Sequence, residues 1–244
     1  MTLQDILDHL TFGEFQQLFV STEINAGTED ADNNKVAAVK ILPSVRLGLT
    51  ELHKRFLLRE GTLTVSLDGR STYVLTKIKT VSNNGTDQYI QDTADEPFLD
   101  DVMKIERVLD NDGCEIPFNK EAHLGAVRAT SYNTLLVPTD LKRASGTPVT
   151  TLTVIYRANH VPINTETALQ DPTTASIDLP VTHLEALLAY IAARVVTPLG
   201  FSGESHEGNN YMAKFERACQ VLNAAGMQVD TARESTKLQD RGWV

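Results

Sequence analysis

The chain has 244 residues, of which 41% are hydrophobic, and a formal net charge of −10. This length and hydrophobic content are enough to bury one large core or two smaller ones, which excludes a disordered chain. The sequence has no apolar run near the roughly 20 residues that span a bilayer. So acidic a chain also lacks the clustered cations that general binding to nucleic acid requires.

The N-terminal residues and the cysteines indicate the compartment. Residues 1–5 contain neither the basic nor the apolar segment of a secretory signal, so we expect no such signal. Cys114 and Cys219 are too few for a disulfide framework. We therefore expect synthesis in a reducing cytoplasm.

The charges are distributed unevenly along the chain. Residues 1–34 contain no Lys or Arg, whereas residues 35–62 are mainly basic. The acidic residues of the first segment are Asp5, Asp8, Glu14, Glu23, Glu29, Asp30 and Asp32. A solvated acidic surface is the simplest interpretation, and a wall that DNA passes without sticking is the functional one.

The first predicted elements are helical. Thr2 can cap a short helix with Asp5 in its first turn. A second short apolar segment follows over 12–19, and then a polar loop over 21–34. The first helix has one apolar face, made by Leu3, Ile6 and Leu10.

A long helix is predicted next, from a cap at Asn33 or Asn34 to about Arg59. Pro43 either kinks this helix or opens a second helix at its first turn. The apolar stripe has helical spacing and consists of Leu42, Val45, Leu49, Leu52 and Phe56.

From residue 62 the hydrophobic period changes to two, which indicates strands. Residues 62–67 and 71–77 around Asp68-Gly69 predict a hairpin, and Asn84-Gly85 predicts a further turn. The other strand candidates are residues 102–109 paired with 114–118, then 132–137 and 149–156. Short strands with frequent turns favour an antiparallel sandwich or a small barrel.

Helices return after a polar connector over 159–178. Thr182 and Glu185 predict a capping box for a helix that starts near Leu179. A second helix is predicted over 210–225, with Gly226 as its C-terminal cap.

The order of helices, strands and helices predicts an α+β protein, in which a β domain is inserted into one helical bundle. We expect an N-terminal arm and bundle helices over 1–61 and the inserted β domain over 62–158. A connector and two bundle helices would then occupy 159–226, and an extended tail would occupy 227–244.

No stretch of the sequence matches a catalytic or cofactor motif. Residues 203–208 resemble a nucleophile elbow, but Glu207 replaces its final glycine and the segment follows a helix. None of the six histidines pairs at metal-ligand spacing, and phosphate-binding glycine loops are absent. We expect His53 to be a partly exposed helix residue and His183 to lie in the first turn of its helix. No metal, cofactor or enzymatic activity is predicted.

Two groups of residues are candidate contact sites. The basic residues Lys40, Arg46, Lys54 and Arg55 either contact an acidic neighbouring subunit or form a solvated helix face. In the tail, the single Trp of the chain stands next to the C-terminal residue, where a local core cannot easily enclose it. The tail either docks on a partner or folds back, through Arg233, Lys237, Arg241, Trp243 and Val244.

Several segments resemble head-to-tail adaptors of tailed bacteriophages, of the short-tailed type. Residues 179–194 (LPVTHLEALLAYIAAR) and 209–216 (NNYMAKFE) look like the last two helices of those adaptors. Residues 47–56 (LGLTELHKRF), before a predicted hairpin, and 105–117 are also similar. The likeness covers about residues 35–225 and consists of element order and composition.

The resemblance implies a structural virion protein at the head-tail junction, made in the cytoplasm of the host. In that family, a ring of usually twelve copies binds under the portal and contacts tail or nozzle proteins. DNA would pass through the channel without sequence-specific binding, and no membrane is involved. The tail of such adaptors often reaches into the portal, which favours the docking role of Trp243.

Two other functions stay open at this stage. The chain could be another tail or baseplate subunit of similar design. Alternatively, it could be a soluble hydrolase or sugar-binding domain, which would need a pocket in the β region with convergent polar groups.

Overall fold

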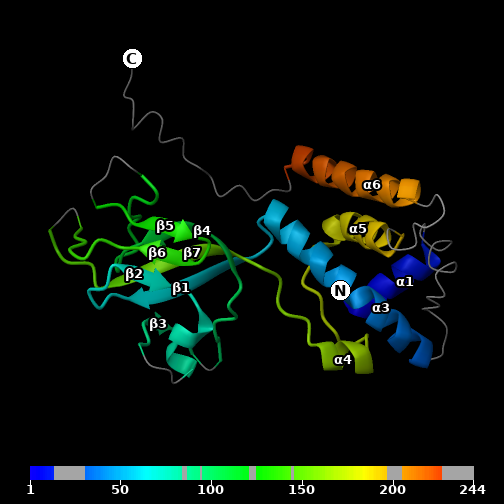
Figure 1. Cartoon of the computed structure of the whole chain (residues 1–244), viewed down its shortest axis with the longest axis horizontal. Helices are drawn as coiled ribbons and strands as arrows, with labels where there is room; N and C mark the ends of the chain where they lie inside the picture. Colours follow the sequence, from blue (N-terminus) through cyan, green and yellow to red (C-terminus); the bar gives the residue numbers. More distant parts are fainter. Residues whose placement is uncertain are drawn as a thin grey trace, which may run out of the picture. The chain divides into compact units, whose positions relative to one another are not determined.

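The computed structural model describes residues 1–13, 31–83, 87–93, 95–120, 125–143, 146–196 and 205–226 (Figure 1). It is a mixed α+β structure with antiparallel sheets, as predicted. The chain divides into two compact units. We call Met1–Leu58 with Ile163–Val244 the helical unit, and Arg59–Pro162 the β unit. The chain therefore leaves and re-enters the helical unit within a few residues of the predicted borders at 61/62 and 158/159.

The helical unit contains helices from both ends of the chain. Its helices are α1 (Leu3–Phe12), α3 (Ala31–Arg55), α4 (Thr165–Gln170), α5 (Leu184–Val196) and α6 (Ser205–Ala224). The predicted cap of α1 is confirmed, because Thr2 and Asp5 exchange two hydrogen bonds between their side chains and backbone N–H groups. The predicted apolar segment after Phe12 lies outside the described residues.

Helix α3 differs from its prediction at both ends. It begins at Ala31, so Asn33 and Asn34 lie within it and do not cap it, and it ends at Arg55. It continues through Pro43 as one helix. Proline removes one hydrogen bond to the carbonyl four residues earlier. Because Pro43 and Val39 both lie on the exposed side of α3, water can solvate that carbonyl.

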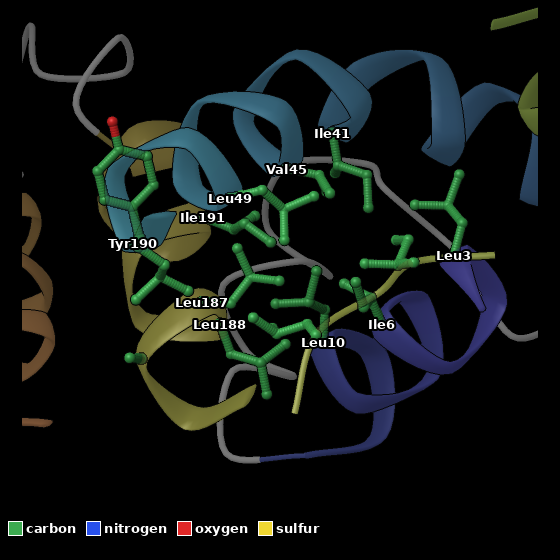
Figure 2. Packing of buried hydrophobic residues seen from close by; sticks show 14 of the residues in the cluster. Leu3, Ile6, Leu10, Ile41, Val45, Leu49, Leu187, Leu188, Tyr190 and Ile191 are labelled. Atoms are coloured by element: carbon green, nitrogen blue, oxygen red, sulfur yellow. The ribbon is translucent and has the colours of Figure 1, made fainter. Parts of the chain in front are cut away.

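The core of the helical unit lies between α1, α3 and α5. Figure 2 shows apolar side chains of the three helices pointing toward one another: Leu3, Ile6 and Leu10 of α1; Ile41, Val45 and Leu49 of α3; and Leu187, Leu188 and Ile191 of α5. Gly48 allows α3 and α5 to approach closely, since a Cβ there would lie 2.7 Å from Leu187 Cδ1. Helix α6 packs on α5 through Phe215, whose ring meets Tyr190 edge to face at 5.2 Å.

The C-terminal half of the helical unit corrects several predictions. The predicted connector contains α4, which Asn164 caps by accepting hydrogen bonds from two backbone N–H groups. The predicted capping box at Thr182 is wrong, because Thr182 lies within a 3-10 turn, Val181–His183, that precedes α5. Helix α6 begins at Ser205, five residues earlier than predicted, within the segment expected to be a loop. Gly226 follows it with φ +68°.

Among the histidines whose burial the structure describes, His53 and His183 are buried, so the predicted partial exposure of His53 is wrong. The exposed fraction is 2% for His53 and 3% for His183. The ring of His183 meets Phe56 edge to face, with 4.8 Å between the centroids. His53 is buried because it lies on the side of α3 that other elements cover. Which side is covered depends on the packing of those elements and not on the helix itself.

The β unit contains two antiparallel sheets. One has the strand order β3-β1-β7-β4 and the other the order β2-β6-β5. The strands are β1 (Glu60–Ser66), β2 (Thr72–Val74), β3 (Ile90–Gln91), β4 (Val102–Leu109), β5 (Arg128–Ser131), β6 (Thr134–Leu136) and β7 (Thr151–Ala158). They enclose a second core, which includes Val65, Tyr73, Val108, Leu135 and Val154.

Of the two predicted hairpins of the β unit, the one around Gly69 is wrong in its pairing and the one after β4 forms in part. The turn at Gly69 forms with φ +88°, but β1 pairs with β7 and β2 pairs with β6 of the other sheet. After β4, the chain turns back antiparallel to it, as predicted, through a bridge between Leu109 and Glu115. The backbone N–H groups of Asp110 and Ile116 donate to the carbonyls of Cys114 and Val108. The central strand β7 is buried along most of its length, so pairing with it protects more apolar surface than a local hairpin would.

Candidate functional site

Helix α3 has a second apolar stripe on its exposed side. Val36, Val39, Pro43 and Leu47 follow one another at spacings of three and four residues, so they lie on one face of the helix. The exposed fractions of Val36, Val39 and Leu47 are 53%, 54% and 52%. We call Val36, Val39, Lys40, Pro43, Leu47 and Lys54 the outer face of α3.

Lys40 and Lys54 are the two predicted contact residues that lie on the outer face. Lys40 is exposed and lies one turn after Val36. Lys54 lies two turns after Leu47, and its ammonium group is 3.2 Å from the carboxylate of Glu51. The outer face therefore combines an apolar stripe with two lysines, of which Lys54 is paired with Glu51, a composition that suits contact with a surface that is apolar and carries a carboxylate.

Arg46 and Arg55, the other two predicted residues, bind within the helical unit. Arg46 Nη2 donates to the carbonyl oxygen of Ile163 at 2.7 Å and to Thr165 Oγ1 at 2.6 Å. These bonds hold the start of α4 against α3. Because Arg46 forms these two hydrogen bonds within its own chain, they compete with its predicted role in a subunit contact.

Arg55 binds α6 by a two-pronged ion pair. Its Nη1 and Nη2 atoms donate to the two carboxylate oxygens of Glu216 at 2.6 and 2.7 Å. Its guanidinium also lies 4.7 Å from the centre of the Phe215 ring. The hydrogen bond with Glu216 raises the pKa of Arg55, and the same bond lowers the pKa of Glu216. Both groups therefore stay charged at neutral pH. Their ion pair joins α3 of the first chain segment of the helical unit to α6 of the second segment.

The predicted docking tail comprises five residues near the C-terminus. Arg233, Lys237, Arg241, Trp243 and Val244 lie outside the described residues. Their assignment to portal docking stays a prediction.

The β unit contains a cleft of about 460 Å³ beside β1 and β3. Its walls include Arg59, Gly61, Gln91, Glu96, Asp101 and Tyr156. Asp101 is buried and accepts hydrogen bonds from Arg59 Nη1 and, at 3.1 Å, from the Tyr156 hydroxyl. Gly61 makes room for this cluster, because a Cβ there would lie 2.7 Å from Tyr156 Cε1.

Three polar side chains of the cleft, those of Arg59, Asp101 and Tyr156, form hydrogen bonds with one another. Burial raises the pKa of Tyr156, and the neighbouring carboxylate of Asp101 raises it further, so the hydroxyl stays protonated. Burial also acts to raise the pKa of Asp92, but hydrogen bonds from Ser82 and from the backbone of Phe98 outweigh it and lower the pKa.

No family model matches the chain, and no curated protein matches it either. In the part of the chain that the structure describes, no three His, Cys, Asp or Glu side chains lie together as a possible metal site. None of the described helices is long and apolar enough to cross a membrane. The surfaces of this chain are therefore the basis for its functional assignment.

Sequence reasoning missed the apolar part of the outer face and the cluster around Asp101. Val36, Val39 and Leu47 have helical spacing in the sequence, but only the longer apolar stripe on the inner side of α3 was identified as an apolar face. The cluster joins Arg59, Asp101 and Tyr156 across 97 positions of the chain, so no local pattern marks it.

Proposed function

We propose that this chain is a structural subunit of a ring that connects the portal of a tailed phage to its tail and continues the DNA channel. The helices would act as a bundle, and the β unit as an inserted sandwich-like domain. The resemblance of residues 35–225 to head-to-tail adaptors supports this assignment. The arrangement of one continuous β unit between the two segments of the helical unit agrees with it.

The outer face of α3 is the observation that carries the proposal. Isolated apolar residues are normal on protein surfaces, but a stripe along one helix commonly marks a surface that binds protein. Here the stripe lies on the same helix whose inner face supplies Ile41, Val45 and Leu49 to the core. A helix that is apolar on two opposite sides suits a subunit that packs inward on its own core and outward on a neighbour.

The net charge of −10 suits the proposed channel. A ring repeats the charge of each subunit around its axis, and a negative wall repels the phosphates of passing DNA. Tight binding there would slow the DNA, because phosphate contacts add affinity with every neutralised charge. The proposed partners are further copies of the chain, the portal protein and a tail or nozzle protein.

A cryo-electron map of the particle that contains this chain tests the proposal. We expect a ring of copies between the portal and the tail. Density elsewhere in the tail would assign the chain to a tail or baseplate subunit instead. Absence from every particle would refute both structural assignments.

The cleft beside Asp101 favours a second candidate, a domain that binds a small polar ligand. The cleft has a size suited to a ligand, but Arg59, Asp101 and Tyr156 already satisfy one another. Ligand-observed NMR with a library of sugars and small polar fragments tests this candidate. Specific binding that Gly61→Ala abolishes would support it, and the absence of binding would remove it.

A further inference from the structure

The helical unit has a groove whose chemistry complements the outer face of α3. The groove has a volume of about 530 Å³ and lies along α1 and the 3-10 turn before α5. Its lining includes Met1, Asp5, Asp8, Phe12, Val181 and Leu184. Phe12 and Val181 are 64% and 79% exposed, so the groove exposes apolar side chains. Beside them lie the carboxylates of Asp5 and Asp8, the N-terminal ammonium group of Met1 and the ring of His9.

The backbone holds this groove in shape. The N–H of Leu3 donates to the carbonyl of Ala175 at 2.9 Å, and the N–H of Ile177 donates to the carbonyl of Met1 at 2.8 Å. These bonds fix the start of α1 against the segment that leads to Val181. A partner therefore meets a formed groove and pays little entropy to order it.

The carboxylates of the groove are held by hydrogen bonds from α1 and its cap. Asp5 accepts a hydrogen bond from the backbone N–H of Thr2 at 2.7 Å, and this bond lowers its pKa. Asp8 accepts a hydrogen bond from the side-chain amide of Gln4 at 2.8 Å. One carboxylate oxygen of Asp8 carries that bond, and a carboxylate has further acceptor positions for a lysine ammonium group.

We propose that the α1 groove of one copy receives the outer face of α3 of the next copy. Val39 and Leu47 would then cover Phe12 and Val181, and Lys40 would approach Asp8. The contact would place apolar side chains against one another and the ammonium group of Lys40 against the carboxylate of Asp8, which is the pattern of protein interfaces with an apolar centre and a polar rim. The N-terminal ammonium group of Met1 is held by the carbonyl of Ile177. This inference rests on the proposed function, because it names the contact that would build the ring.

The two surfaces of one copy cannot bind each other. Helix α1 packs on the inner side of α3, where Leu3 and Ile6 meet Ile41 and Val45 (Figure 2). The outer face lies on the opposite side of α3, so the groove that binds it in our proposal belongs to another copy. Because each copy has one groove and one outer face, the contact is head-to-tail, and it closes a ring when the rotation between copies allows.

Cross-linking of the full chain tests the contact directly. Cys114 is exposed and is first replaced by Ser, while Cys219 is buried and is kept. The test variant then combines Phe12→Cys with Val39→Cys, and oxidation should produce a ladder of disulfide-linked multimers. A matched control pairs Phe12→Cys with Ile78→Cys, since Ile78 is exposed in the β unit. We expect no ladder from this control.

Charge exchange gives an independent measurement. Sedimentation velocity should show that Asp8→Lys or Lys40→Glu weakens self-association about 10-fold, because each variant places like charges together. The double variant should recover wild-type association. A general loss of folding would not be reversed in this way, so recovery identifies the pair.

The outcomes separate the contact from the proposed function. No ladder, or no recovery in the double variant, refutes the contact. If a particle map still shows the ring in that case, another surface builds it and the proposed function stands. A monomer whose introduced thiol at position 12 resists labelling would mean that the chain's own residues occupy the groove, which also refutes the contact. A ladder from a chain that is absent from the head-tail junction would refute the function and keep the contact.

Discussion

The two sides of α3 differ although their residue types are alike. Leu49 on the inner side is 1% exposed, and Leu47 on the outer side is 52% exposed. Helix propensity is identical for the two leucines, so it cannot distinguish these roles. What distinguishes them is the partner: the core of the same chain for Leu49 and, in our proposal, a neighbouring copy for Leu47.

The largest expected effect separates these two leucines by stability. Leu49→Ala should lower the free energy of unfolding by about 2–5 kcal/mol, because it leaves a cavity in the core. Leu47→Ala should change it by less than about 0.5 kcal/mol, as exposed positions usually do. Urea unfolding followed by circular dichroism measures both. Equal effects would contradict the assignment of the two faces.

The next largest effect on the free energy of unfolding is expected in the β unit. Arg59→Met leaves the buried carboxylate of Asp101 without its cation, which should cost about 1–3 kcal/mol. Tyr156→Phe removes one hydrogen bond to the same carboxylate and should cost about 1 kcal/mol.

The units have separate cores, so these losses should appear in the unfolding of the β unit. Fluorescence cannot report them cleanly, because the only Trp is Trp243 in the tail. Hydrogen exchange resolved by mass spectrometry separates the units. Faster exchange of α3 in Arg59→Met, with β7 unchanged, would contradict the assignment.

Acid should weaken the helical unit through His183. Burial lowers the pKa of His183, and its Nε2 atom has no hydrogen-bond partner among the described residues. The unfolded chain therefore binds a proton more readily than the folded chain once the pH falls below about 6.5, the ordinary pKa of histidine. The stability that the neutral ring provides is complete above that pH and is lost as the pH falls through the lowered folded pKa.

Thermal unfolding at pH 7.5 and pH 5 checks the histidine prediction. His183→Leu should reduce the difference between the two curves. An unchanged difference in His183→Leu would refute the role of His183.

The smallest effect concerns the ion pair between α3 and α6. Glu216→Gln should lower stability by about 0.5–1 kcal/mol at low salt, because both partners are partly exposed. High salt should reduce the loss, since it screens the charges of the wild-type pair. Chemical unfolding at two ionic strengths measures the change. A loss that does not depend on salt would assign the effect to packing on Phe215 instead.

The helices were predictable because their signals are local. The stripes of α1, α3 and α5 recur every three or four residues, and Thr2 and Asp5 form a cap within one turn. The strand pairing was not predictable, because β1 pairs with β7 about 90 positions later and only the folded β unit brings them together. The burial of His53 and the cluster at Asp101 depend on the same long-range packing.

The candidate site was partly predictable for a related reason. The sequence identified the basic residues of α3, but it could not tell that Arg46 and Arg55 bind their own chain while Lys40 points outward. That division depends on where α4 and α6 pack.

Sedimentation velocity of Leu47→Asp against wild type tests the central claim most directly. The control is Leu136→Asp, because Leu136 is an exposed leucine of the β unit. Our account predicts that wild type and Leu136→Asp associate as the concentration rises, whereas Leu47→Asp stays monomeric with unchanged unfolding. Association of Leu47→Asp to the wild-type extent would contradict the claim that the outer face of α3 joins the subunits.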